Sequence, residues 1–92
     1  MYATVMLIKM KKQDLEKFID INLKATDKIK QFKGFVSASY YVDREKEEFG
    51  VTAIYETLED LEASRNSRRP ELGEMMESII ENTYEVVNIV TS

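Results

Sequence analysis

The chain has 92 residues, of which 43% are hydrophobic and 33% charged, and its formal net charge is −4. This length and balance are typical of one folded domain, so we predict a single domain over residues 1–92. The sequence contains no cysteine and no histidine. This excludes disulfides, thiolate metal sites and the most common general base, and we expect neither a metal site nor a cofactor. The acidic balance also argues against nucleic acid as a partner.

The start of the sequence has none of the features of a targeting signal. Residues 1–4 lack basic side chains, and the apolar run that follows ends at Lys9. No later stretch approaches the ~18 apolar residues that cross a bilayer. We therefore expect a cytoplasmic protein without membrane contact.

The first predicted element is a strand over Tyr2–Met10, an almost unbroken apolar run. Side chains of both parities are apolar, with Met6 and Ile8 on one side and Val5 and Leu7 on the other. Because successive side chains of a strand point to opposite faces, both faces of this strand must be covered.

A helix is predicted next, from Gln13–Asp14 through about Phe32, because apolar residues recur at spacings of three and four. Gly34 is the glycine expected just beyond its C-terminus. The segments Phe35–Val42 and Phe49–Glu56 then predict two strands of a hairpin around the charged turn at 43–48.

The second half of the chain predicts another helix and a last strand. Thr57 with Asp60 three residues later is typical of a helix start. Pro70 is expected to break or restart this helix, and the apolar spacing from Leu72 to Ile80 predicts that it continues. We place the last strand at Tyr84–Val90.

The element order is therefore β-α-β-β-α-β. This order predicts an α+β ferredoxin-like sandwich, in which two helices cover one face of a four-stranded antiparallel sheet with the first and third strands central. The helices leave the second apolar face of the first strand open. An identical sheet is the economical cover, so we predict a homodimer joined sheet to sheet.

Several segments resemble the antibiotic biosynthesis monooxygenase family along nearly the whole chain. Phe32–Val36 is similar to its Pro-Gly-Phe turn, Ala53–Ala63 to its strand-3 exit and following helix, Ser67–Leu72 to its mid-helix break, and Tyr84–Val87 to its closing strand. The resemblance implies a dimeric α+β barrel and a cofactor-independent monooxygenase acting on a small aromatic hydroxylated substrate of quinol or polyphenol type.

The sequence also departs from this family. Its members often carry a tryptophan at the strand-3 exit, where this chain has Glu56–Thr57 and no tryptophan anywhere. The haem-degrading branch uses a histidine ligand, so the absence of histidine excludes that branch. A non-catalytic dimeric barrel that binds a small apolar ligand, or serves as an interaction module, stays open as the alternative.

Five residues are candidates for substrate binding, and each also has a structural interpretation: Asn22, Tyr40, Tyr55, Arg65 and Asn88. The two asparagines interrupt apolar patterns, so they either face a ligand or are core amides satisfied by backbone. The tyrosines can donate to a developing oxyanion or pack at an interface. Arg65 lies in a cluster with Arg68 and Arg69, and it can bind an anionic group or complement a helix dipole.

Overall fold

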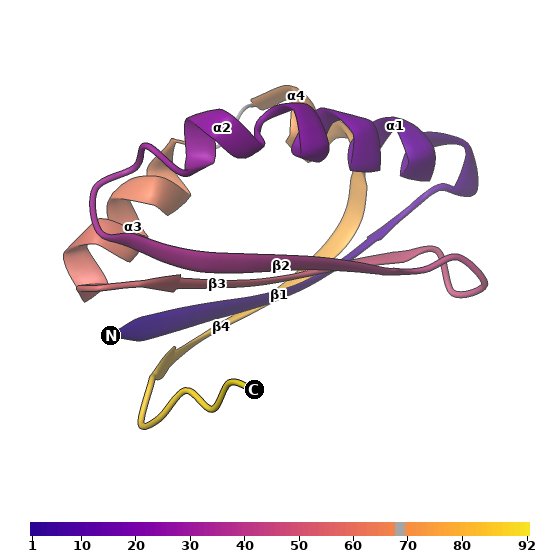
Figure 1. Cartoon of the computed structure of the whole chain (residues 1–92). Coiled ribbons are helices and arrows are strands. Elements are labelled where there is room, and N and C mark those ends of the chain that lie inside the picture. The colour runs from indigo at the N-terminus through magenta and orange to yellow at the C-terminus, as the bar shows by residue number, and fades with distance from the viewer. Residues whose placement is uncertain (68–69) are drawn as a thin grey trace.

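The computed structural model describes residues 1–67 and 70–92 (Figure 1), with side chains for all of these except 70–72. The Arg68–Arg69 pair of the arginine cluster, and with it part of the expected Ser67–Leu72 break, lies outside the described residues. The elements are, in chain order, β1 (Tyr2–Met10), α1 (Lys12–Lys24), α2 (Thr26–Ile29), β2 (Phe35–Asp43), β3 (Glu48–Tyr55), α3 (Leu58–Asn66), α4 (Pro70–Met75) and β4 (Met76–Glu85).

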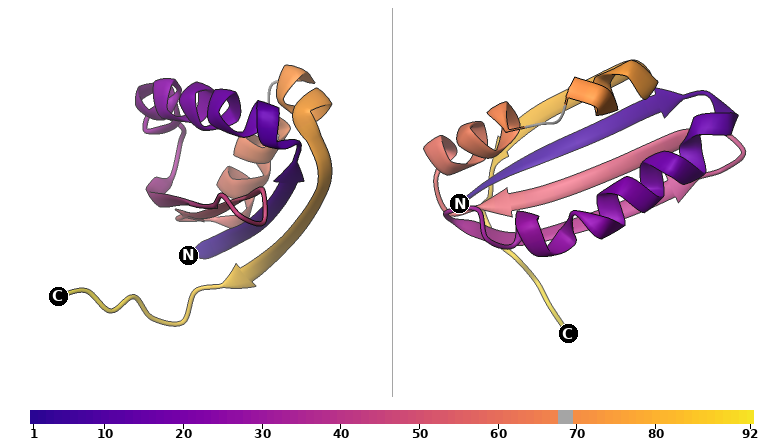
Figure 2. Two further views of the ribbon diagram at one scale, coloured as in Figure 1. Left: turned by 90° about the vertical axis from the view of Figure 1, so that its right-hand side faces the viewer. Right: turned by 90° about the horizontal axis from the view of Figure 1, so that it is seen from above.

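The four strands form one antiparallel sheet in the order β2-β3-β1-β4. The helices all lie on one side of this sheet, and the segment after β4 leaves on the opposite side (Figures 1 and 2). This arrangement confirms the predicted ferredoxin-like α+β fold with the first and third strands at the centre. No helix in the described part of the chain is both long and apolar enough to cross a membrane.

The core lies between the sheet and the helices. Leu15 and Phe18 of α1 are buried against Phe49 of β3, and the rings of Phe18 and Phe49 meet edge to face at 5.0 Å. Leu61 anchors α3 to the same cluster and is only 1% exposed. The apolar spacing seen in the sequence therefore identifies the side of each helix that faces the sheet.

The single long helix predicted as far as Phe32 is wrong in its second half. The first helix ends at Lys24, Ala25 has φ −85° and ψ −2°, and a short α2 follows as far as Ile29. Thr26 and Asp27, both weak helix formers, occupy the start of this second helix. Gly34 adopts the predicted positive φ, at 75°, in the turn into β2.

The prediction was also wrong at the end of the chain. The helix expected as far as Ile80 stops at Met75, and the last strand spans Met76–Glu85 rather than Tyr84–Val90. Strand β4 pairs with β1 from Tyr2↔Glu85 to Met10↔Met76. All nine residues of β1 therefore find partners on this side, which satisfies backbone groups that a helix here would leave unpaired.

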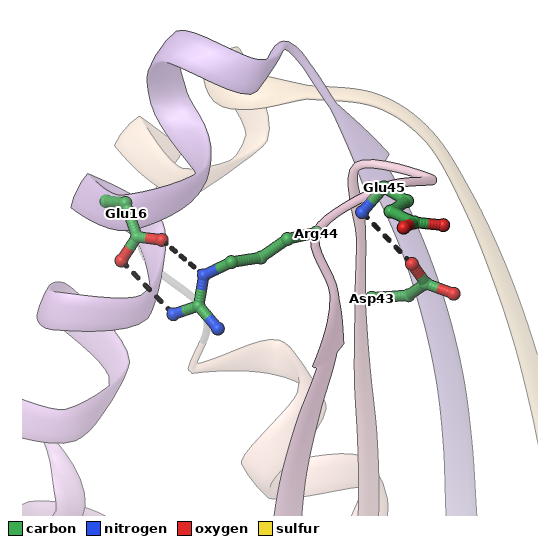
Figure 3. A network of polar contacts seen from close by, with 4 residues as sticks. All are labelled: Glu16, Asp43, Arg44 and Glu45. Atoms are coloured by element: carbon green, nitrogen blue, oxygen red, sulfur yellow. Dashed lines mark hydrogen bonds and ion pairs between the residues drawn. The ribbon is translucent and has the colours of Figure 1, made fainter.

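Three polar contacts fix the connections. The Thr57 hydroxyl accepts a hydrogen bond from the backbone N–H of Asp60 at 3.1 Å, which confirms the predicted cap of α3. At the other end of the sheet, Arg44 in the β2–β3 turn pairs with Glu16 of α1 at 2.7 Å, and Asp43 accepts from the backbone N–H of Glu45 (Figure 3). The hydrogen bond from Arg44 holds the pKa of the Glu16 carboxyl below its usual range.

Candidate functional site

A cavity of about 170 Å³ lies between the helices and the sheet. Residues from all four strands and from α1, α2 and α3 line it. An engineered protein cavity of roughly 150 Å³ binds benzene, so this space is large enough for a small aromatic ring system.

The cavity exists because the sheet has small side chains in one transverse row. Ala38 pairs with Ala53, Ala53 with Thr4, and Thr4 with Thr83, so these four residues lie side by side across the strands. The neighbouring row contains much larger side chains, Tyr40 on β2 and Met6 on β1 among them. Ala38, Ala53 and Thr4 of this row line the cavity, and their small side chains leave space above the sheet that larger side chains would occupy.

Aromatic rings form one wall. Phe49 contacts Phe18 edge to face and Tyr40 at a ring distance of 5.7 Å. Ile21 and Ile29 line the helix side of the same space. Most of the lining is apolar, so the few polar groups determine which ligand atoms can be accepted.

Asn22 lines the cavity from α1, as one of the two sequence interpretations requires. Its side-chain nitrogen donates to the carbonyl oxygen of Phe18, one turn earlier, at 2.8 Å. The amide is therefore anchored by a local backbone bond through its nitrogen, and its oxygen is the atom that can accept a hydrogen bond from a ligand.

Tyr40 and Tyr55 also line the cavity, from neighbouring strands. Burial, with a smaller contribution from Tyr55, raises the pKa of Tyr40, so its phenol stays protonated and can donate. The Tyr55 hydroxyl is 2.6 Å from Ser64 Oγ of α3, which fixes its ring. Tyr41 points to the opposite face, where its hydroxyl lies 3.1 Å from Thr52.

Arg65 reaches the cavity from the last turn of α3 and contacts the β4 side. It donates to the Thr83 hydroxyl at 2.8 Å, and its Nε lies 3.2 Å from the carboxylate of Glu81. Thr4 donates to the same carboxylate at 3.1 Å. These contacts place a charged pair on an otherwise apolar wall, with Glu81 as the member that the sequence analysis missed.

The missed residue follows from the misplaced strand. A helix over 72–81 puts Glu81 with the other acids on the solvent side, whereas β4 turns it toward the cavity together with Ile79.

The prediction that Asn88 contacts a ligand has no support in the position of this residue. It lies exposed beyond the end of β4 and does not line the cavity. The structure thus brings together four of the five candidate residues and adds Glu81.

Fold and cavity together define a ferredoxin-like α+β protein with a mostly apolar internal site. The fold is that of solved antibiotic biosynthesis monooxygenase structures, which confirms the resemblance at the level of structure. A putative antibiotic biosynthesis monooxygenase from Nitrosomonas europaea superposes with a TM-score of 0.83 at 17% identity, covering 96% of this chain and 100% of the other.

Two further solved structures illustrate different activities on this fold. SnoaB from Streptomyces nogalater, a cofactor-independent oxygenase, has a TM-score of 0.77 at 9% identity, covering 99% of this chain and 97% of its own. The haem-degrader MhuD from Mycobacterium tuberculosis, with two haems bound, has a TM-score of 0.74 at 14% identity and coverages of 99% and 100%. No family model and no curated protein sequence matches the chain.

The residues of this cavity do not fit a haem. The chain has neither histidine nor cysteine to ligate the iron. A space of about 170 Å³ is matched to a small ring system and not to a porphyrin macrocycle. No step through haem is therefore derived below.

Proposed function

We propose that the chain is a cofactor-independent monooxygenase that acts on a small aromatic hydroxylated substrate bound in the cavity. The observation that carries the proposal is an apolar space of aromatic dimensions whose few polar groups, among them Asn22, Tyr40 and Arg65, can each hydrogen-bond to a substrate oxygen. The structural similarity to a protein described as a cofactor-independent oxygenase supports the same reaction class.

In the proposed reaction the substrate supplies all the electrons. The hydroxyl group ionises, and the electron-rich ring carbon para to it reacts with O₂. One oxygen atom stays on that carbon as a carbonyl, the hydroxyl oxygen becomes a second carbonyl, and the other atom of O₂ leaves as water with the two hydrogens. A phenol thus gives a quinone and water without an external reductant.

The protein contributes an environment for this chemistry. The Tyr40 phenol, whose pKa is raised by burial, remains a donor to the developing oxyanion. Phe18, Phe49 and Val51 exclude water from the ring. Asn22 offers an amide oxygen to a second substrate hydroxyl, which suits a polyphenol better than a simple phenol.

Oxygen uptake with 1-naphthol, whose expected product is 1,4-naphthoquinone, tests the proposal. Isotopically labelled O₂ should place one labelled atom in the quinone and one in water. Tyr40→Phe should slow turnover, whereas Tyr84→Phe, at an exposed position on the other face, should not. Uptake no faster than that of a heat-denatured sample, with 1-naphthol and with hydroquinones, would contradict the proposal.

The mostly apolar lining favours one alternative, a non-catalytic protein that binds a small apolar ligand. Binding of naphthalene with an affinity equal to that of 1-naphthol, without oxygen uptake, would support this alternative. An oxygenase of the proposed type must instead prefer the hydroxylated ring.

We further propose a homodimer joined through the sheet face opposite the helices. On that face Leu7 pairs with Ile80, and these side chains are 40% and 61% exposed. Tyr84, 54% exposed, extends the same surface along β4. Contiguous apolar side chains across a sheet are typical of a surface that is covered in solution.

Light scattering of Ile80→Glu tests this dimer. The substitution should yield a folded monomer, because the side chain is already exposed and its loss costs the single chain little. Leu23→Glu on α1, where the side chain is 59% exposed, is the matched control and should leave the mass unchanged. A wild-type protein that is monomeric at micromolar concentration would refute the dimer.

A further inference from the structure

The charged pair on the β4 wall contains an unsatisfied donor. The Nε atom of Arg65 is buried and makes no hydrogen bond within the described part of the chain, although it lies 3.2 Å from Glu81 Oε2. The N–H is not aligned with the carboxylate, so proximity gives an ion pair without a hydrogen bond. Buried donors are rarely left unpaired, and an exception in a cavity needs an explanation.

The surroundings hold both members of the pair in place. Thr83 accepts from a terminal nitrogen of Arg65, and Thr4 donates to Glu81 Oε2. Thr4 lines the cavity, and Thr83 lies exposed next to it on β4, as its pairing partner in the sheet. A donor and an acceptor therefore lie next to each other beside the space that a ligand would occupy.

One ligand oxygen can use both groups. A hydroxyl oxygen placed against the pair accepts from the Arg65 Nε–H and donates its own proton to the Glu81 carboxylate. An ether or carbonyl oxygen can only accept, and it would leave the carboxylate without a donor from the ligand. The pair thus distinguishes a free hydroxyl from every methylated or fully oxidised form of the same ring.

We propose that Arg65 and Glu81 form the binding site for an aromatic hydroxyl group, and that Glu81 accepts its proton during turnover. The binding part stands on the geometry alone, and the role in turnover rests on the proposed monooxygenase function. Glu81 is accordingly a catalytic residue in this proposal, and Thr4 and Thr83 are positioning residues.

The proton transfer leaves the charge of the cavity unchanged. The O–H bond of the ligand breaks, its electron pair stays on the ligand oxygen, and the proton bonds to a carboxylate oxygen of Glu81. Arg65 then pairs with the phenolate that replaces the carboxylate as its counter-ion. The phenolate subsequently gives its electrons to O₂, which is the co-reactant of the proposed function.

The other titratable groups around the cavity do not compete for this role. Lys28 lines it from α2 and is exposed, and Tyr40 and Tyr55 come from β2 and β3. Lysine is a hydrogen-bond donor only and tyrosine carries a hydroxyl, whereas a carboxylate has two acceptor oxygens. Among the described residues that line the cavity, Glu81 is the only carboxylate.

Anaerobic binding of 1-naphthol, 1-methoxynaphthalene and naphthalene tests the site without turnover. Wild-type protein should bind 1-naphthol more tightly than the methoxy compound by roughly 10- to 100-fold, which is what a hydrogen bond to a charged group contributes. Glu81→Gln should reduce this preference to less than about threefold, because the amide can also donate to an ether oxygen. Wild-type protein should also bind the methoxy compound more tightly than naphthalene, because the Arg65 Nε–H can donate to the ether oxygen, and Arg65→Met should abolish this second preference.

Fluorescence gives a second measurement on the same samples. 1-Naphthol becomes a strong acid when excited, so beside a carboxylate it should emit as the naphtholate. In Glu81→Gln the emission of the neutral form should increase. Glu85→Gln on the exposed end of β4 and Arg44→Met on the β2–β3 turn are matched controls and should behave as wild type.

The outcomes separate this proposal from the oxygenase activity. A hydroxyl preference that survives in Glu81→Gln, or its absence from wild type, overturns the site even if oxygen is consumed. A preference that depends on Glu81 in a protein that consumes no oxygen upholds the binding site and refutes the role in turnover. Thermal melting shows whether each variant is folded. If a variant does not fold, the emission spectrum of 1-naphthol bound to the wild-type protein still tests the site.

Discussion

The substitution Asn22→Leu distinguishes two interpretations of this residue, a structural amide bonded to protein groups and a side chain that contacts a ligand. The amide donates to the Phe18 carbonyl at 2.8 Å, and losing one such bond costs about 0.5–1.5 kcal/mol of folding free energy. The carbonyl is not stranded, because it belongs to helix α1 and accepts the backbone N–H one turn later. No penalty for an unpaired buried group is therefore added.

The leucine also contributes stabilising terms. Full burial of a leucine side chain is worth about 1.5–3 kcal/mol, and a partly buried position such as residue 22 recovers about half of this. Leucine is also the better helix former, by a few tenths of a kcal/mol. We expect the free energy of unfolding of Asn22→Leu to stay within about 1 kcal/mol of wild type, while affinity for a polyphenol falls because leucine, a side chain of similar size, offers no oxygen to the second hydroxyl.

Urea denaturation and anaerobic titration with a dihydroxynaphthalene, beside 1-naphthol, measure the two effects. Asn22→Ala is the matched variant, because it removes the amide and leaves a smaller side chain. Both variants should retain binding of naphthalene and 1-naphthol and lose only affinity for polyphenols. A loss of more than about 2 kcal/mol in Asn22→Leu would show that the amide supports protein groups beyond Phe18 and would refute this reasoning.

Three further predictions test separate parts of the structure. Because burial raises the pKa of Tyr40, stability should be fully present below pH ~10 and fall as the pH rises further; Tyr40→Phe should flatten this alkaline loss in urea denaturation. Thr57→Ala removes the cap of α3 and should lower the free energy of unfolding by about 1 kcal/mol, seen as a lower Tm. Gly50→Ala should destabilise by about 1–2 kcal/mol, because the new methyl group collides with the Tyr41 ring, whereas Gly73→Ala in open space should be neutral or stabilising.

The elements from β1 to the start of α3 could be predicted from the sequence, apart from the break of the first helix at Ala25, because their signals are local and agree with one another. The run Tyr2–Met10 fits a strand in length and composition, and the hairpin of β2 and β3 is separated by a charged turn. Thr57 and Asp60 carry the side chains of a helix cap, and the structure contains that hydrogen bond. Periodicity also places Asn22 on the inner side of α1, where it lines the cavity.

The second half could not be predicted because its decisive contacts are not local. Met75, Met76, Ile79 and Ile80 have helical spacing, and only the pairing of β1 with β4 makes residues 76–85 a strand. The strand also contains a register shift opposite Lys9 and Met10, which changes the parity of the side chains near its start. Neither strand pairing nor a bulge has a signature in the periodicity of one segment.

The same error explains why the sequence identified Arg65 without its partner. On a helix, Glu81 belongs with Glu74 and Glu77 on a solvated acidic side, and an isolated Arg65 at a cavity mouth selects anions. On a strand, Glu81 turns inward beside Thr4, and the pair with Arg65 selects a neutral hydroxyl instead. Whether residues 76–85 form a helix or a strand thus changes the predicted charge of the ligand. A comparison of anionic and neutral aromatic ligands therefore tests the strand assignment together with the site. Binding of 1-naphthol and exclusion of 1-naphthoate is the result that the strand requires.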